Sequence, residues 1–292
     1  MTDPNRLSRR GAFVPAVVML TLLTTALAGC GQQSQDTTTV TAGDKSAVNT
    51  CAEVAAVVEE ARGTVLGAVE GSLSPAAAGE RLTDISGSLQ AAAEHSSDNV
   101  VQQSVQDVVD SIAAYLAVLP DRAIGAYEDA ESDVSGRLTG FRRTCPVENA
   151  GFDAGTDGWA ATSASTEITQ TSAGRNGGGG LDLTNLGTEV STIGVTDSPN
   201  WVDRTWRGTY RAGLWARATS GSPTLTLVVR EKSGTAVVGE ARETVTLGPA
   251  WSFVGVGYDV TGRGGALDVR VTAAGVAPDA EVHIDGLALA RG

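Results

Sequence analysis

Residues 208–218, with the sequence GTYRAGLWARA, decide the fold of the second half of the chain. Their even positions are apolar or small: Tyr210, Ala212, Leu214 and Ala216. Trp215 and Arg217 stand at odd positions between them. Alternation with a period of two is typical of a β-strand, whose successive side chains point to opposite faces. The pattern therefore predicts a strand that buries its even positions and presents Trp215 and Arg217 on the other face.

Further short runs rich in Val, Thr and Leu lie on both sides of this strand, separated by Gly, Asn, Asp and Ser. They comprise residues 181–185, 190–196, 224–231, 251–260, 267–272 and 281–289. Regularly spaced short strands with turn residues between them indicate an all-β sandwich. We expect this domain to span residues 147–292, because the helical periodicity of the preceding residues ends at Pro146.

Four segments of the predicted sandwich follow one another in a recognisable order. They are NAGFD at 149–153, GW at 158–159, the stretch 198–218 and VHIDGL at 282–287. In this order they resemble the carbohydrate-binding modules of families 4, 9 and 22. The resemblance implies a galactose-binding-like jelly roll, a concave face that binds a polysaccharide or other glycan, and one structural calcium ion. Asp153 and Gly286 depart from it, because those modules usually carry Glu and Asp there.

Aromatic residues are the first candidates for such binding. Sugars stack their apolar faces on aromatic rings, while polar and charged side chains fix the hydroxyl groups. Trp215 with Arg217 is the predicted carbohydrate-binding platform, and Trp201 and Trp206 are expected to reach the same face from the preceding loop. The alternative for all three tryptophans is that they pack against the core or within loops.

Two aspartates are the candidate calcium ligands. Asp153 and Asp285 lie near the two ends of the domain, which a sandwich can bring together. Calcium is a hard cation that prefers oxygen ligands, so the two carboxylates and backbone carbonyls would suit it. The alternative is that both are turn residues that accept backbone hydrogen bonds.

The preceding residues, 47–146, have apolar side chains at steps of three and four, which is helical spacing. Four such stretches are joined by short turns, at residues 74–75, 97–98 and 120–121. Short turns make neighbouring helices antiparallel, so we predict an up-down-up-down four-helix bundle. Residues 43–146 carry 16 acidic and 7 basic side chains. This excess is either a solvated acidic surface or a face for a cationic partner.

Cys51 and Cys145 are predicted to form a disulfide. The start of the first helix and the end of the fourth lie at the same end of such a bundle, and both cysteines fall in register with the apolar stripe. Thiols oxidise outside the cytoplasm. Closing a loop of this length adds on the order of 3–4 kcal/mol. The alternative is two unpaired, buried cysteines.

The N-terminus has the layout of an export signal. Arginines within residues 1–10 precede an uncharged apolar run at 11–28. This run ends in Leu-Ala-Gly-Cys at 27–30, which resembles the lipobox of bacterial lipoproteins and implies a covalent lipid on Cys30. We therefore expect a signal peptide at 1–29 and a flexible lipidated tether at 30–46, with the protein held on the extracytoplasmic face of the cell membrane. An uncleaved membrane anchor or a plain signal peptide are the alternatives.

The charge and the scarcity of histidine exclude several functions. A net charge of −13 makes nucleic-acid binding unfavourable. The two histidines, His95 and His283, fall in separate predicted domains, and no nucleophilic triad, zinc spacing or carboxylate pair stands out. We expect His283 to pack or to face solvent, and Trp159 and Trp251 to pack in the core or at its rim. The predicted function is reversible polysaccharide binding without catalysis. The alternative is a structural component of the cell envelope whose helical domain binds an envelope protein.

Overall fold

The computed structural model describes residues 38–39, 42–121, 125–153, 155–175 and 177–292. Residues 33–292 form one compact unit. The predicted signal peptide and the lipid-attachment residue Cys30 lie outside the described residues. Within the part of the chain that is described, no helix is both long enough and apolar enough to span a bilayer.

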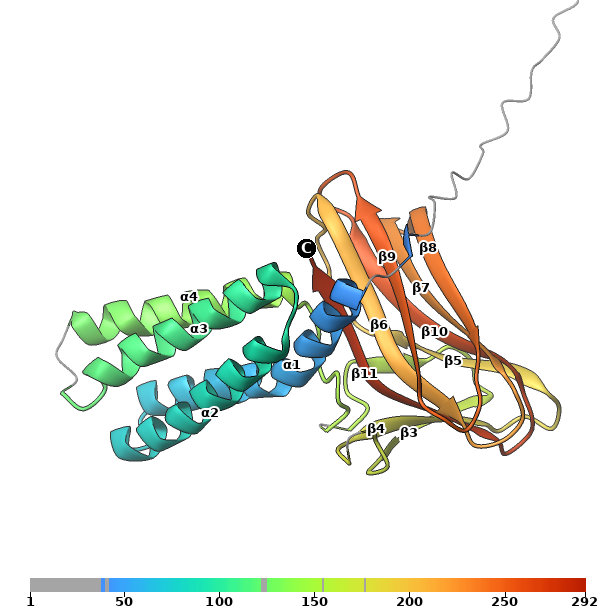
Figure 1. Cartoon of the computed structure of the whole chain (residues 1–292), viewed down its shortest axis with the longest axis horizontal. Helices are drawn as coiled ribbons and strands as arrows, with labels where there is room; N and C mark the ends of the chain where they lie inside the picture. The colour runs from blue at the N-terminus through green and yellow to red at the C-terminus, as the bar shows by residue number, and fades with distance from the viewer. Residues whose placement is uncertain (1–37, 40–41, 122–124, 154, 176) are drawn as a thin grey trace, which may run out of the picture. The chain divides into compact units, whose positions relative to one another are not determined.

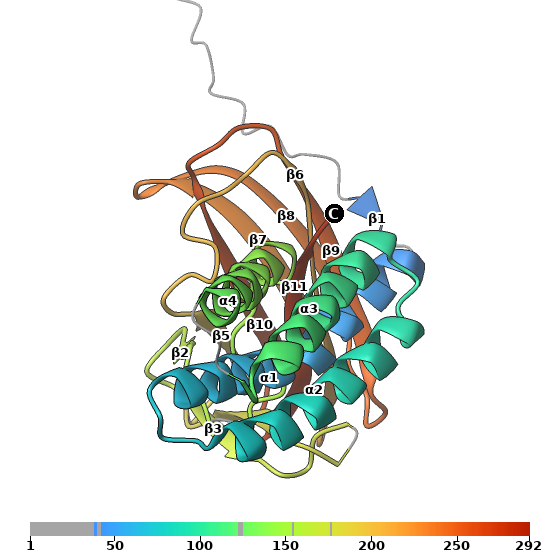
Figure 2. The same ribbon diagram turned by 90° about the vertical axis from the view of Figure 1, so that its left-hand side faces the viewer.

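Four helices form the first half of this unit, as predicted (Figures 1 and 2). They are α1 (Ala42–Val69), α2 (Pro75–His95), α3 (Asn99–Val118) and α4 (Ala126–Thr144). The turns carry helix-start signals, because the side chain of Ser74 accepts a hydrogen bond from the Ala77 N–H and that of Asp98 accepts from Val100 and Val101. Successive helices pack side by side around Leu82, Ile112, Tyr115 and other buried residues.

The predicted disulfide between Cys51 and Cys145 is confirmed. Both residues are buried, and their Cα atoms lie 5.3 Å apart. Cys51 is not at the start of its helix, since α1 begins at Ala42. The bond therefore joins the end of α4 to the interior of α1 rather than to its first turn.

Two antiparallel sheets form the second half, which confirms the predicted sandwich (Figure 1). The six-stranded sheet has the order β1-β9-β6-β11-β4-β3, and the five-stranded sheet has the order β2-β5-β10-β7-β8. From β4 onward the chain passes repeatedly from one sheet to the other, as in a jelly roll. The strands are β1 (Thr38–Thr39), β2 (Trp159–Ala161), β3 (Thr166–Thr171), β4 (Gly180–Asn185), β5 (Ser191–Asp197), β6 (Gly208–Ala218), β7 (Thr224–Ser233), β8 (Ala236–Thr246), β9 (Ser252–Val260), β10 (Ala266–Val276) and β11 (Glu281–Arg291).

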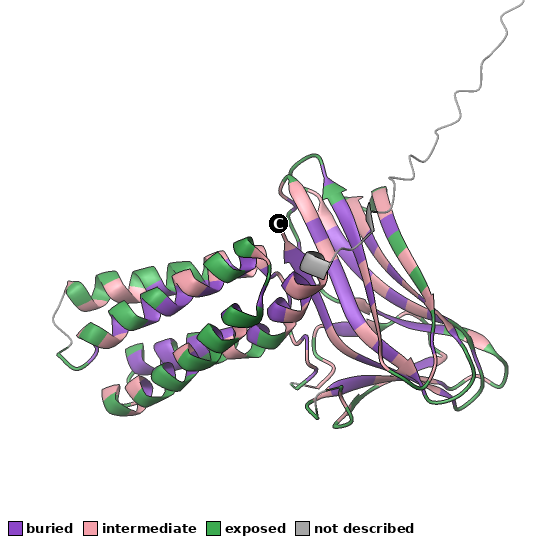
Figure 3. Ribbon diagram, viewed as in Figure 1, coloured by how far each residue is buried: buried purple, intermediate pink, exposed green. Residues whose placement is uncertain are grey.

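The alternation along β6 is as predicted. Tyr210 and Leu214 are buried in the sandwich core, whereas Trp215 and Arg217 are only partly covered, on the outer face of the six-stranded sheet. Figure 3 shows the resulting purple and pink alternation along the strands. Burial of one face of each sheet fixes which side chains can meet a ligand.

The first turns of α1 pack on the outer face of the six-stranded sheet. Val48 is fully buried, and it shares a hydrophobic cluster with Ala288 and Ala290 of β11 and with Phe253 of β9. A Cβ atom on Gly213 would lie 2.7 Å from the Phe253 ring and 3.0 Å from Val48, so this contact requires glycine. The helix is therefore part of both halves of the unit.

The predicted tether at residues 30–46 is too long at its C-terminal end. Thr38 and Thr39 pair with β9, opposite Gly257 and Val256, and α1 already begins at Ala42. These residues belong to the fold because strand pairing and helix packing on the sheet fix them.

Candidate functional site

Four side chains form a row across the outer face of the six-stranded sheet. Asp182 of β4 lies opposite His283 of β11, and His283 lies opposite Arg217 of β6. Trp251, directly before β9, comes next to Arg217, because Ser252 pairs with Ala216. We call Asp182, His283, Arg217 and Trp251 the polar row.

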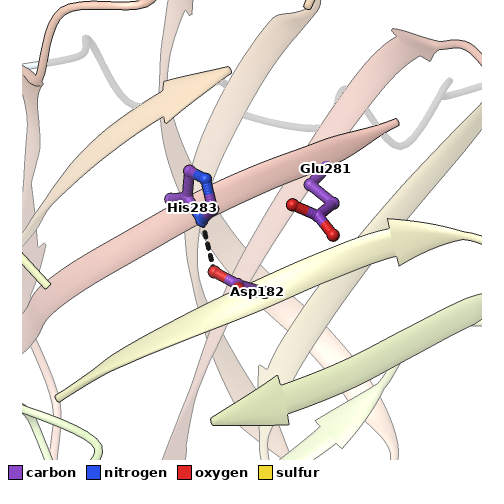
Figure 4. A group of neighbouring side chains, drawn as sticks. All are labelled: Asp182, Glu281 and His283. Carbon is purple, nitrogen blue, oxygen red and sulfur yellow. Dashed lines mark hydrogen bonds and ion pairs between the residues drawn. The ribbon is translucent and has the colours of Figure 1, made fainter. Parts of the chain in front are cut away.

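The members of the polar row contact one another. The Asp182 carboxylate and the Nδ1 atom of His283 form a short hydrogen bond (Figure 4). The Arg217 guanidinium lies 4.8 Å from the centre of the Trp251 ring, and the Trp251 and His283 rings are 6.5 Å apart. The Nε atom of Arg217 is buried and has no hydrogen-bond partner. Leaving a buried donor unpaired is costly, so the position of this guanidinium is held by its stacking on Trp251 and not by a hydrogen bond at Nε.

Glu281 adds a second carboxylate to this area. The three side chains each offer one possible metal-ligand atom, and these atoms lie within 4.8 Å of one another in Asp182, Glu281 and His283. Glu281 and His283 come from the same strand, as Figure 4 shows. Carboxylate and imidazole are ligands for divalent transition metals. However, Asp182 already binds Nδ1 of His283, and the cationic Arg217 is the next residue of the row. The arrangement therefore favours hydrogen bonding to a polar ligand.

Trp215, the predicted stacking platform, is partly covered by other side chains. Its indole N–H donates to the Asn49 side-chain oxygen of α1 at 3.1 Å. The Arg175 guanidinium lies 3.7 Å from its ring centre, and the Lys45 ammonium lies 4.4 Å from it. The ring thus helps to hold α1 on the sheet, and it also lines a pocket with Arg175 and Asp285, so its use as a stacking platform stays a prediction.

The structure does not bring Trp201 and Trp206 to the face of Trp215 and Arg217, so that expectation was wrong. Both line a pocket with Tyr210, near the start of β6, whereas Trp215 lines a different pocket and Arg217 is near the end of this strand. Trp201 packs edge-on against Trp159, with ring centres 4.5 Å apart, which is the packing alternative. Trp206 stacks with Arg263, whose guanidinium lies 3.8 Å from the ring centre.

Asp153 and Asp285 are brought together, as the sandwich topology predicted. Both line a pocket of about 180 Å³ that also includes Glu53. Asp285 accepts a hydrogen bond from the Arg175 N–H at 2.7 Å, and Asp153 accepts one from the Gly179 N–H at 3.1 Å. Burial raises the pKa of Asp285 despite this hydrogen bond. The two carboxylates act here as acceptors for the loop backbone, and their use as calcium ligands stays a prediction.

Trp251, Asp182 and His283 are the residues of this site that sequence reasoning missed. In residues 251–260 the valines stand at even positions and Trp251 at an odd one, so alternation predicts that Trp251 and the valines lie on opposite faces of the strand. Trp215 and Leu214 alternate in the same way along residues 208–218. A search for aromatic residues at outward positions could therefore have found Trp251. Nothing in the sequence indicates that Asp182 pairs with His283, because their strands lie 101 positions apart in the chain.

No protein-family model matches this sequence, and no curated protein matches it either. Solved structures match the sandwich half. A carbohydrate-binding module of family 61, TmCBM61 in complex with β-1,4-galactotriose, is 16% identical, with 51% of this chain and 99% of that one covered and a TM-score of 0.39. The CBM22-1 xylan-binding domain of Xyn10C from Paenibacillus barcinonensis is 15% identical, with 50% and 94% covered and a TM-score of 0.41.

The arabinose-bound α-L-arabinofuranosidase MgGH51 is 15% identical, with a TM-score of 0.41. The match covers 51% of this chain but only 26% of that enzyme. The class that the fold defines is a helical bundle joined to a jelly-roll sandwich, and it is established by the sheet order of this chain itself. The likenesses concern the second half of that architecture alone.

Proposed function

We propose that this chain is a lipid-anchored, extracytoplasmic protein that binds a polysaccharide on the polar row, without catalysis. The carrying observation is that Trp251, which is half-buried, and the Arg217 guanidinium beside it lie in one row with His283 and Asp182 on the outer face of the six-stranded sheet. An aromatic ring offers a stacking surface for the apolar face of a sugar, and fixed polar groups bond its hydroxyls.

The geometry of the row suits an extended ligand. Strands in a sheet lie about 4.8 Å apart, so the distance from β4 to Trp251 is roughly 15 Å, the length of a short oligosaccharide. Asp182 accepts hydrogen bonds, Arg217 donates them, and His283 does either according to its tautomer. Sugar hydroxyls are both donors and acceptors, so this set is chemically complementary to them.

The test is retention of residues 33–292 on immobilised xylan, galactan and isolated cell-wall polysaccharide. Trp251→Ala should weaken binding about tenfold, since stacking of one ring contributes about 0.5–1.5 kcal/mol beyond burial. Trp206→Ala is the matched control, because it removes a half-exposed tryptophan at the other end of the sandwich. Failure to bind any of the polysaccharides, or equal binding by the Trp251→Ala variant, would refute the proposal.

Lipid attachment is tested separately. Cells fed labelled palmitate should incorporate it into the wild-type chain and not into the Cys30→Ala variant, and only the wild type should stay in the membrane fraction. Label in both variants would exclude Cys30 as the attachment site. An unlabelled wild-type chain would favour the alternatives of a plain signal peptide or an uncleaved anchor.

A second candidate function is protein binding by the helical bundle. The observation in its favour is a groove of about 960 Å³ between α3 and α4, lined by Asp107, Asp129 and Asp133 together with Arg137, which pairs with Asp107 and Asp133. The net negative charge of this lining suits a cationic segment of an envelope protein. Capture of one specific envelope protein that Asp129→Asn with Asp133→Asn abolishes would support it over glycan binding.

A further inference from the structure

Four exposed arginines gather at the end of the sandwich where β6 begins and β9 ends. We call Arg143, Arg204, Arg207 and Arg263 the arginine cluster. Arg143 and Arg204 line one pocket of about 240 Å³ together with Trp206. Arg263 stacks on the same Trp206 ring, and the backbone carbonyl of Arg207 accepts a hydrogen bond from the Arg291 guanidinium at 3.0 Å. Arg204 and Arg263 thus lie near the half-buried Trp206 ring, Arg143 lines the same pocket, and Arg207 is the next residue in the chain after Trp206.

This cluster is positive although the chain as a whole has a net charge of −13. Among the described residues, no carboxylate lies within 4.0 Å of any of the four guanidinium groups. Three other exposed arginines are paired with carboxylates: Arg62 with Glu59, Arg137 with Asp107 and Asp133, and Arg242 with Glu240. Asp203 is the one acidic residue that lines the pocket. Because salt screens charges over about 8–10 Å, a ligand here meets the local positive potential rather than the distant acidic surface.

The strand β1 connects the same end of the sandwich to the N-terminal segment. Thr38 pairs with Gly257, three residues before Val260, at which β9 ends. Since β1 is antiparallel to β9, the chain enters β1 from the Val260 end. Eight residue steps separate Thr38 from Cys30, which is at most about 28 Å of chain.

We propose that the arginine cluster and Trp206 lie on the anionic phospholipid headgroups of the membrane that holds Cys30. This inference rests on the proposed lipid anchor. Arginine binds phosphate groups through its planar donor fork, and tryptophan is enriched at membrane–water interfaces. Basic residues near an anionic leaflet each strengthen attachment, so four of them complement a single-point lipid anchor.

The proposed contact also orients the polar row. Arg217 lies nine residues after Gly208 along β6, about 30 Å at strand spacing. With the arginine cluster on the lipid surface, Trp251 and its neighbours lie at the end of β6 that is distant from the membrane, where they can meet an external polysaccharide.

The test is co-sedimentation of residues 33–292, which form one compact unit without Cys30, with vesicles. Vesicles of equal parts phosphatidylglycerol and phosphatidylcholine are compared with phosphatidylcholine alone, at low and high salt. The cluster variant changes Arg143, Arg204, Arg207 and Arg263 to Gln. The control variant changes the exposed Arg62, Arg81, Arg137 and Arg242 to Gln, which removes the same charge from other surfaces.

We expect the wild type to bind only the anionic vesicles and to be released by high salt. The cluster variant should bind at least about tenfold more weakly, and the control variant within about twofold of the wild type. No binding to anionic vesicles at low salt, or equal losses in the two variants, would overturn the proposal. It would also be overturned if the cluster bound polygalacturonate, a soluble polyanion, but not vesicles. Because Cys30 is absent, failure of lipid attachment is detected only in the palmitate experiment.

Discussion

Asp197 makes the stability of the sandwich depend on pH in a direction opposite to that of most aspartates. Its side chain is 3% exposed at the end of β5. Loss of hydration raises its pKa from the ordinary 3.8 to about 7, although its oxygens accept hydrogen bonds from the N–H groups of Trp201 and Val269, at 3.0 and 2.9 Å. Repulsion from Asp268 acts in the same direction as burial.

The sign follows from proton binding. Between pH 4 and 7 the folded chain holds a proton on Asp197 that the unfolded chain has lost, so the free energy of unfolding decreases as the pH rises. With a folded pKa of about 7 and an unfolded one of 3.8, the decrease from pH 5 to pH 8 is roughly 2–3 kcal/mol. Above pH 8 this contribution is constant.

The assay is urea unfolding at pH 5, 6, 7 and 8, followed by tryptophan fluorescence. All five tryptophans lie in the sandwich, so the signal reports that half: Trp159, Trp201, Trp206, Trp215 and Trp251. Asp197→Asn does not titrate, but its amide nitrogen cannot accept one of the two backbone hydrogen bonds, so the variant should be less stable than the wild type at pH 5. Its free energy of unfolding should not decrease from pH 5 to pH 8 as that of the wild type does. Parallel pH profiles for the two proteins would refute the assignment of this pH dependence to Asp197.

Three further changes test other parts of the fold. Replacing Cys51 and Cys145 by Ala should lower the free energy of unfolding by about 4 kcal/mol, measured in urea by far-ultraviolet circular dichroism. A decrease below about 1 kcal/mol would contradict this prediction. Gly194→Ala would place a Cβ atom 2.4 Å from a carbonyl oxygen of β10, so the melting temperature of the protein should fall by several degrees. Gly262→Ala is the control, because a Cβ atom there meets no other atom within 4 Å and should leave the melting temperature unchanged. Asp268→Ala leaves Arg230 and Lys232 of β7 without their shared carboxylate, so the free energy of unfolding in urea should fall by about 2–3 kcal/mol. An unchanged free energy of unfolding would show that solvent screens these ion pairs.

Much of the fold was predictable because its signals are local. Apolar side chains at steps of three and four predicted the four helices and their bundle. The antiparallel order of those helices predicted the disulfide between Cys51 and Cys145. The strands that were missed are β1, β2, β3 and β8. The residues of β8 are mostly exposed, and Ala241 is its one buried residue, so its sequence shows little apolar alternation. Pairing of β1 with β9 is a contact between segments more than 200 residues apart, which no local pattern records.

The candidate site was predictable only in part, for the same physical reason. Alternation correctly placed Trp215 and Arg217 on the outer face. It could not show that Asn49 of α1 and the loop residue Arg175 cover Trp215, nor that Trp251 and His283 flank Arg217. Those contacts depend on strand register and on packing between the two halves of the unit.

The packing of α1 has a consequence for how this protein can be divided or recombined. Val48 belongs to the sheet contact, and Cys51, one turn later, belongs to the bundle. A cut at Pro146 would leave Ala288 and Ala290 of the sandwich without their cover and α1 without its sheet. The two halves are therefore not interchangeable modules. A new sandwich could replace the present one only if its outer face accepted the same helix.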